Sequence, residues 1–406
     1  MSWSPFSRTA TLEEMGFSAR TFNARFWSLI GATFLGFLGI GTVLPGLAPH
    51  IRHSLGGSDQ TVGFVIGVFS FVALAARFVS GPLADRRGRK ITMLVGLASC
   101  GLAGGAYLLP LGISGAYLGR IFQGFGEACL YTGAAAWAVE LGGIERGAQA
   151  LGYVSSGIWG GISAGPVVGQ WLGSFAHAAF FQMTAAVLAL ALLTQVAEDY
   201  KPEPHTRRKA WIPRALIAPG VAVGFVNVHY PVIAGFLILH LAKHGNSGPA
   251  AFSAYAGLIL LSRFFLGGLP DRLPPAITFY GGLVAMAAGL VVLASAPAPP
   301  FAIGAAALLG FGFSFPWSSV AGTVLRNTPE GERGSAVSLL SAFYDLFVGL
   351  SSFAAGAIAG HFGYSAAFVM AALAIGAATV AGRAVFSQPA DTRLAPLNVT
   401  IALNQE

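Results

Sequence analysis

The chain has 406 residues, of which 55% are hydrophobic and only 10% are charged, and its mean hydropathy is +0.69. An ordinary soluble protein carries roughly 25% charged residues, so this chain has too little polar surface to cover a water-soluble fold. The composition therefore excludes a soluble enzyme, a disordered protein and a nucleic-acid binder. It indicates a protein whose outer surface lies in lipid.

Twelve apolar stretches are each long enough to cross a bilayer, which takes about 20 helical residues. They are residues 26–48, 61–82, 91–110, 113–139, 148–172 and 177–197, followed by 214–241, 250–269, 275–295, 300–325, 335–359 and 364–386. The sequence predicts an all-α membrane protein with twelve transmembrane helices in two six-helix bundles, 26–197 and 214–386. A polar linker at 198–213 joins the two bundles.

The distribution of basic residues predicts how the chain crosses the membrane. With both chain ends in the cytoplasm, 19 Lys and Arg residues, Arg263 among them, fall in tails, inner loops and inner helix ends, and only Arg52 and Lys243 fall outside. Cytoplasmic loops of membrane proteins carry such an excess of positive charge. Residues 1–25 and 387–406 are therefore expected to be cytoplasmic tails, and this topology accounts for the net charge of +7. Many glycines and short loops favour a bacterial inner membrane.

The two halves of the chain repeat each other. Residues 76–86 read ARFVSGPLADR, and residues 262–272, which lie 186 positions later, read SRFFLGGLPDR. At the same offset Gly124 and Gly126 match Gly310 and Gly312, and the offset grows to 187 between 145–147 and 332–334. Parallel repeats of this kind are related by an axis along the membrane normal, and their binding site lies between them near the midplane.

A basic loop between the second and third spans reads GPLADRRGRK over residues 81–90. Glycine permits a tight helix exit, and an acid beside basic residues can exchange partners between two conformations. We expect either a latch between the two bundles or simple anchoring by positive charge. The gating candidates are Gly81, Asp85, Arg86, Gly88 and Arg89, with repeat counterparts at Asp271 and Arg272.

The fourth span carries a polar stripe of Arg120, Gln123, Glu127 and Tyr131, whose spacing places them on one helical face. Charge in hydrocarbon is costly, so this face is expected to meet a polar cavity or a partner helix. Glu127 and Arg120 are candidates for proton coupling, with a buried structural ion pair as the alternative. Gln123 and Tyr131 are candidates for the wall of a substrate cavity.

The fifth span carries a glycine pattern formed by Gly152, Gly161, Gly165, Pro166 and Gly169. Glycines allow helices to pack closely and proline bends a span. The pattern is either a functional motif or ordinary small-residue packing.

Polar and aromatic residues of the second half complete the candidate site. Asp345, near mid-depth of its span, is a second candidate proton site, or else a hydrogen bond between packed helices. His229 is expected either to contact the substrate or to be satisfied by other protein groups. The further cavity candidates are Asn227, Phe313, Trp317 and Tyr344, of which Phe313 and Trp317 are the repeat counterparts of Glu127 and Tyr131.

With these three motifs, residues 25–386 resemble the major facilitator superfamily, and specifically its twelve-span drug/proton antiporter branch. The resemblance implies that the basic loop latches the two halves and that the span-four arginine takes part in proton transfer. It also implies that the span-five glycine motif marks an exporter, although Gln170 replaces the last glycine of that motif. A monomer is expected for this fold.

The leading hypothesis is a proton-coupled antiporter that exports a small amphiphilic molecule by rocker-switch alternating access. The alternative is a proton symporter or uniporter that imports a nutrient such as a sugar or an organic acid. A sensor or scaffold without transport is a rival from another class. We find no nucleotide-binding loop, metal-ligand cluster or nucleophile constellation, so no cofactor, metal or enzymatic activity is predicted. The expected partners are the small molecule, protons and the bilayer, with no nucleic acid.

Overall fold

The structure, a computed structural model, describes residues 22–198, 213–242, 247–266, 269, 273–328 and 333–387. The first half holds α1 (Ala24–Thr42), α2 (Leu44–Pro49), the π-helix η1 (His50–Ser54), α3 (Asp59–Arg87), α4 (Arg89–Leu108), α5 (Ile113–Trp171) and α6 (Phe175–Thr194). The second half holds α7 (Arg214–Asn227), α8 (His229–Ala242), α9 (Gly248–Leu266), α11 (Pro275–Ala294), α12 (Pro299–Phe313), α13 (Pro316–Arg326), α14 (Arg333–Phe362) and α15 (Tyr364–Phe386). Within the described ranges there is no β-strand.

The helix α5 has two arms that run in opposite directions. In the first arm, Gly119 packs against Tyr107 and Gly133 against Met93, so this arm is antiparallel to α4. In the second arm, Gly161 packs against Phe34 and Gly169 against Thr42, so this arm is parallel to α1. Each arm therefore makes a crossing of its own.

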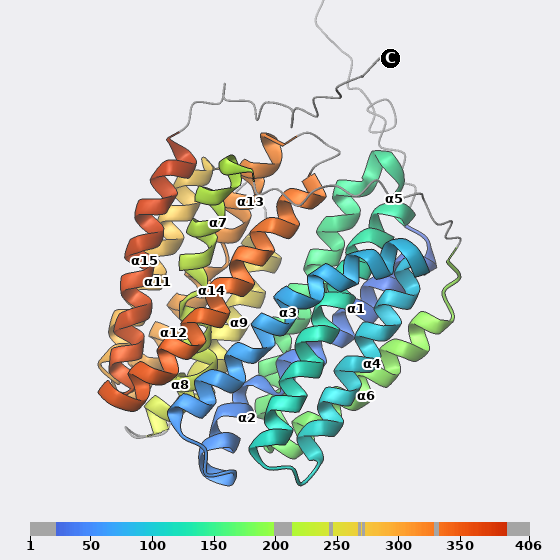
Figure 1. Cartoon of the computed structure of the whole chain (residues 1–406). Coiled ribbons are helices and arrows are strands. Elements are labelled where there is room, and N and C mark those ends of the chain that lie inside the picture. The colour runs from blue at the N-terminus through green and yellow to red at the C-terminus, as the bar shows by residue number, and fades with distance from the viewer. Residues whose placement is uncertain are drawn as a thin grey trace, which may run out of the picture.

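Ten further segments of the described chain are long and apolar enough to cross a membrane. Together with the two arms of α5 they make twelve crossings, so the predicted all-α fold with twelve helices in two bundles is confirmed. In Figure 1 the blue-to-green first half lies beside the yellow-to-red second half, and α3 and α14 run side by side where they meet. We call the end at which α3 ends and α4 begins the linker end, and the opposite end, near η1 and Gly363, the far end (Figure 1).

Three crossings are broken in the middle. A break at Val43 separates α1 from α2, one at Val228 separates α7 from α8, and one at 314–315 separates α12 from α13. Pro45, Pro231 and Pro316 lie just beyond these breaks. Proline lacks the backbone N–H and clashes with the preceding turn, which explains the interruptions.

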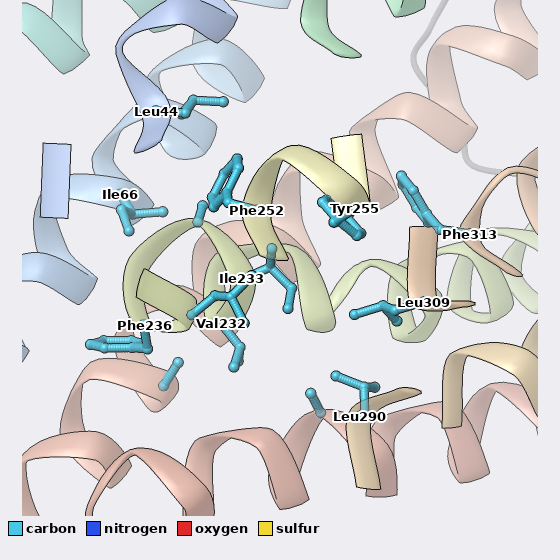
Figure 2. Close-up of a cluster of buried hydrophobic side chains, with 14 of the residues drawn as sticks. Leu44, Ile66, Val232, Ile233, Phe236, Phe252, Tyr255, Leu290, Leu309 and Phe313 are labelled. Atoms are coloured by element: carbon cyan, nitrogen blue, oxygen red, sulfur yellow. The ribbon is translucent and has the colours of Figure 1, made fainter. Parts of the chain in front are cut away.

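The apolar core is continuous across the two bundles from the middle of the crossings toward the far end. Figure 2 shows Leu44 and Ile66 of the first half close to Phe252, Ile233 and Phe236 of the second. All five side chains are buried, and they belong to one cluster. Burial of shared apolar surface therefore holds the bundles together at this end.

Candidate functional site

The centre of the candidate site is Arg77, an α3 arginine that contacts carboxylates of both bundles. Its Nε donates a hydrogen bond to Asp345 Oδ2 of α14 at 2.8 Å, and its Nη2 lies 3.9 Å from Glu127 Oε1 of the first arm of α5. The Arg77 Cζ also lies 5.1 Å from the ring centre of Tyr131. The side chains of Arg77, Glu127 and Asp345 are 12%, 13% and 3% exposed. Charges so shielded from water persist only with partners.

Glu127 is incompletely satisfied in this arrangement. Its Oε2 is buried and makes no hydrogen bond to any group that the structure describes. A buried acceptor without a donor costs free energy, and a proton on that carboxyl group lowers the cost because the neutral form needs less solvation. Glu127 is therefore chemically suited to bind a proton.

Arg120 and Gln123 lie farther along the same stripe but face the interior of the first bundle. Arg120 Nη1 donates to Gln123 Oε1 at 2.6 Å, and its guanidinium lies 4.2 Å from the ring centre of Phe69. The Gln123 Oε1 also accepts from the Tyr107 hydroxyl at 3.2 Å, and the Gln123 amide donates to Gln182 Oε1 at 3.2 Å. Three side chains of the expected stripe therefore contact α3, whereas Gln123 contacts α4 and α6. Of the four side chains, Glu127 and Tyr131 lie at the Arg77 cluster.

Asn227 and His229 lie at the break between α7 and α8. The His229 Nδ1 is 2.7 Å from Val226 O and its Nε2 is 3.0 Å from the Tyr255 hydroxyl, so both ring nitrogens have protein partners. The Asn227 amide donates to Val223 O at 2.7 Å, while its buried Oδ1 has no partner in the described structure. His229 thus acts here as a bridge between α8 and α9.

A small cavity of about 30 Å³ lies between the bundles. It is lined from the first half by Leu44, Trp159, Ile162, Ser163 and Pro166, and from the second by Tyr230, Ile233, Ala234, Phe252, Tyr255, Ala256, Ile259 and Phe313. Figure 2 shows that Tyr255 and Phe313, two of its aromatic walls, lie next to each other. This cavity has room for only one or two water molecules, so the bundles must separate before it can hold a substrate. Trp317 and Tyr344, also expected here, pack edge to face at 6.5 Å.

A larger hollow, of about 690 Å³, lies at the far end within the first half. It is lined by loop and helix-end residues such as His50, Pro110 and Phe175. Its walls come from the first half alone, whereas both halves line the smaller cavity, so we place the functional site at the smaller, central cavity.

Sequence reasoning missed the two arginines that matter most at the bundle interface. The sequence alone does not single out Arg77, and it assigns Arg263 to an inner helix end. Arg263 does lie in the last turn of α9, but its Cζ is 4.1 Å from the ring centre of Trp159 on the other bundle, a contact that was not predicted. The signal was present, because Arg77 and Arg263 are the matching arginines of the internal repeat.

The basic loop contacts the first bundle. Gly88, with φ +104°, ends α3, and the Glu198 carboxylate accepts the backbone N–H groups of Arg89 and Lys90 at 2.6 and 3.1 Å. A carboxylate at a helix N-terminus is favourable because it meets the positive end of the helix dipole. Arg89 Nη1 also pairs with Glu140 Oε2 at 2.9 Å. Gly81 is half-buried, and the side chains of Asp85 and Arg86 are exposed at the end of α3, while Asp271 and Arg272 lie outside the described residues.

Glycines of the span-five pattern bring the second arm of α5 against α1. A Cβ atom at Gly161 would lie 2.6 Å from Phe34 O, and one at Gly165 would lie 2.6 Å from the Gly41 backbone. Gly169 contacts the Thr42 backbone, and the Pro166 ring lies against Gly41, whereas Gly152 has open space around it. Close helix packing is therefore one role of Gly161, Gly165 and Gly169.

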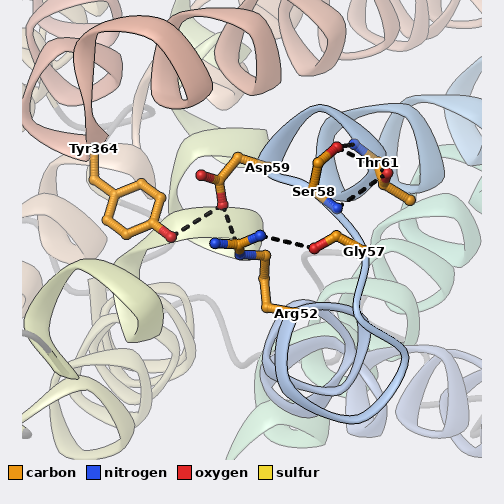
Figure 3. A network of polar contacts seen from close by, with 6 residues as sticks. All are labelled: Arg52, Gly57, Ser58, Asp59, Thr61 and Tyr364. Carbon is orange, nitrogen blue, oxygen red and sulfur yellow. Dashed lines mark hydrogen bonds and ion pairs between the residues drawn. The ribbon is translucent and has the colours of Figure 1, made fainter.

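Polar contacts join the bundles at the far end (Figure 3). Asp59, at the start of α3, pairs through Oδ1 with Arg52 Nε at 3.0 Å, and it accepts a hydrogen bond from the Tyr364 hydroxyl of α15 at 3.0 Å. Arg52 also donates to Gly57 O at 2.8 Å. Together with the apolar core beneath, these contacts close the far end in the conformation described.

Two helical bundles that meet around buried charges define a multi-pass membrane transport protein. The chain belongs to the Major Facilitator Superfamily, whose family model it matches over residues 29–243 and 232–400. An uncharacterized MFS-type transporter of Burkholderia mallei is 29% identical over 383 residues, which cover 89% of this chain and 92% of the relative. Another, of Salmonella typhimurium, is 27% identical over 366 residues, which cover 86% and 94%. These relatives indicate a transporter rather than an enzyme.

Solved structures of two transporters share the fold. The nucleoside transporter NupG has a TM-score of 0.73 at 12% identity, covering 89% of this chain and 100% of that one. A D-xylose-proton symporter has a TM-score of 0.70 at 14% identity, covering 87% and 97%. At these identities the likeness shows the fold alone, and the antiporter branch expected from the motifs stays a prediction.

Proposed function

We propose that the protein is a proton-coupled secondary transporter in which Glu127 and Asp345 bind the coupling proton around Arg77. The observation that carries this proposal is the bridge from Arg77 of one bundle to Asp345 of the other, with Glu127 beside it. One arginine between two carboxylates has a net charge of −1 when all three groups are ionised. One bound proton neutralises the group, and because the two carboxyl groups interact, the proton belongs to the pair and not to either residue alone.

The cluster couples protonation to the position of the bundles. In the ionised state the Arg77–Asp345 bridge holds α3 against α14, and below it Gly63 packs on Gly356 toward the far end. A proton on Asp345 removes one charge of the bridge and weakens this contact. Protonation therefore favours separation of the bundles at the far end, which is one half of an alternating-access cycle.

Export of a small amphiphilic molecule by proton antiport is the first form of this proposal. An antiporter that carries neither proton nor substrate must stay in one conformation. The ionised Arg77–Asp345 bridge between α3 and α14 stabilises the conformation that is closed at the far end. The span-five glycine pattern supports export only by resemblance, because the packing of Gly161 and Gly165 against α1 is equally compatible with import. In this scheme the linker end faces the cytoplasm and the protein works as a monomer.

Proton symport of an organic acid is the second form, and Arg263 favours it. An anion bound near that guanidinium adds negative charge to the interface, and a proton on Glu127 or Asp345 balances it. The two forms differ in the direction of proton movement relative to the substrate.

The experiment uses purified protein in proteoliposomes with a pH-sensitive dye inside and an outward-directed substrate gradient. Substrates are first selected from a compound panel by thermal shift. Antiport predicts acidification of the lumen as substrate leaves, and symport predicts alkalinisation. Glu127→Gln and Asp345→Asn are expected to abolish the pH change in either case. Substrate-driven pH changes that persist in both variants would overturn the assignment of the proton site.

A further inference from the structure

Arg263 is a half-buried cation, and two of its guanidinium nitrogens have no hydrogen-bond acceptor in the described part of the chain. Its Nε and Nη2 are both buried and make no hydrogen bond there. Its guanidinium instead lies over the Trp159 ring, with Cζ 4.1 Å from that ring centre and 5.9 Å from the ring centre of Phe313. Aromatic faces stabilise a cation, but they do not replace the hydrogen bonds that its N–H groups lose on leaving water.

The internal repeat explains what is missing. Arg77 and Arg263 are equivalent at the offset of 186, but their surroundings differ. The counterpart of Glu127 at that offset is Phe313, and the positions 186 and 187 residues before Asp345 are Trp159 and Ile158. Both acids that contact Arg77 therefore have uncharged counterparts at Arg263. The second half keeps the cation and omits its anions.

The geometry of the two unpartnered nitrogens indicates the kind of anion that fits. The N–H groups on Nε and on one Nη point the same way, and this edge of a guanidinium matches the two oxygens of a carboxylate in a bidentate pair. Trp159 and Phe313, which flank the guanidinium, also line the central cavity together with Tyr230 and Tyr255. A ligand at this place has its charged end at Arg263 and its body among aromatic walls.

We propose that Arg263 binds the carboxylate of an organic-acid substrate whose apolar body occupies the aromatic cavity between α5 and α9. This inference rests on the proposed transport function and names its substrate class. The bound carboxylate takes the place of the acid that the repeat lacks, because an arginine in a low-dielectric site is strongly stabilised by an anionic partner. The cavity of about 30 Å³ enlarges when the bundles separate, which admits the substrate.

The test measures equilibrium binding without any proton gradient, so its outcome is independent of proton coupling. The full chain, purified in detergent, is titrated with matched probes that share an apolar body: benzoate, phenylacetate and octanoate, against benzamide, benzylamine and phenyl phosphate. We expect thermal stabilisation by at least one carboxylate and a weaker effect of its uncharged, cationic and phosphate analogues. Arg263→Gln is expected to weaken carboxylate affinity about tenfold or more, since a charge-assisted bidentate pair is lost.

A second variant restores the acid that the repeat lacks. Phe313→Glu places a carboxylate at the counterpart of Glu127, where we expect it to pair with Arg263. This pair should raise the unfolding temperature of the ligand-free protein above that of Phe313→Gln. It should also abolish binding of carboxylate probes. The proposal is overturned if no carboxylate probe stabilises the protein, or if benzamide or phenyl phosphate binds as tightly as the carboxylates or more tightly. It is also overturned if carboxylate binding survives in Arg263→Gln. Failure here leaves the proton site untouched, because Glu127→Gln and Asp345→Asn are judged by pH changes.

Discussion

Arg77 and Arg263 occupy equivalent positions in the two halves of the chain, yet Arg77 lies among carboxylates and Arg263 lies between aromatic rings. A symmetric pair of helices thus carries an asymmetric pair of sites. The first is suited to a proton and the second to an anion, and both lie at the interface that alternating access opens and closes.

The Arg77–Asp345 bridge is expected to contribute to stability as well as to coupling. Asp345→Asn leaves a buried arginine with only Glu127 nearby, and we expect a loss of about 3 kcal/mol in the free energy of unfolding, near the lower end for unpairing a buried charge. Chemical denaturation in detergent micelles measures this loss. The matched control is Asp59→Asn at the more exposed far-end pair, with an expected loss of about 1 kcal/mol or less. Equal losses in the two variants would contradict the special place of the buried bridge.

Arg77 and Asp345 are expected to be energetically coupled. In a double-mutant cycle, Arg77→Gln combined with Asp345→Asn should cost less than the sum of the single variants, because each single variant already breaks the same Arg77–Asp345 pair. The same denaturation measurement gives the coupling energy, which we expect to exceed about 1 kcal/mol. Additive losses would show that the contact at 2.8 Å contributes nothing measurable.

Two glycines of one motif should respond differently to the same methyl group. Gly165→Ala places a Cβ 2.6 Å from the Gly41 backbone, so the contact between α5 and α1 must widen, at an expected cost of about 1–3 kcal/mol. Gly152→Ala meets open space and is expected to be neutral or to stabilise by up to about 1 kcal/mol, because alanine loses less backbone entropy than glycine. Thermal unfolding of the two purified variants compares them directly, and the reverse order would contradict the described packing.

The Tyr364–Asp59 hydrogen bond is expected to hold the far end closed. Tyr364→Phe removes a contact at 3.0 Å between α15 and α3, and a typical hydrogen bond contributes about 0.5–1.5 kcal/mol, so the open population should rise roughly two- to tenfold. Spin labels at Gln60 and His361, two exposed positions at the far end, report the opening as a longer distance. The spin labels react with cysteines introduced at these two positions. The native Cys100 and Cys129 are buried, so they do not compete for the label. An unchanged distance distribution would show that this hydrogen bond is dispensable.

The architecture could be predicted from the sequence because backbone N–H and C=O groups in lipid must bond to each other, which permits little besides helices. The length of each apolar stretch and the internal repeat then indicate how many helices there are and how they are grouped. The sequence was also enough to single out Glu127 and Asp345, since an acid within an apolar span is costly without a function or partner. It did not predict that Arg77, rather than Arg120, contacts both acids. That depends on which face α3 turns toward α14, and helix rotation follows from packing details such as Gly63 on Gly356. The contact of Arg263 with Trp159 was not predicted for a related reason, because it depends on how α9 packs against α5 of the other bundle.

The central claim is that protonation of the Glu127–Asp345 pair releases Arg77 and allows the far end to open. The most direct test is the distance between spin labels at Gln60 and His361 in lipid nanodiscs, measured from pH 8 to pH 5 in an Asp59→Asn background that removes the carboxylate of the far-end pair. We predict a closed, short distance at high pH that shifts toward longer values at low pH, and a long distance at every pH in Arg77→Gln. A distance that stays short at all pH values, or a pH response that persists unchanged in Arg77→Gln, would contradict the claim.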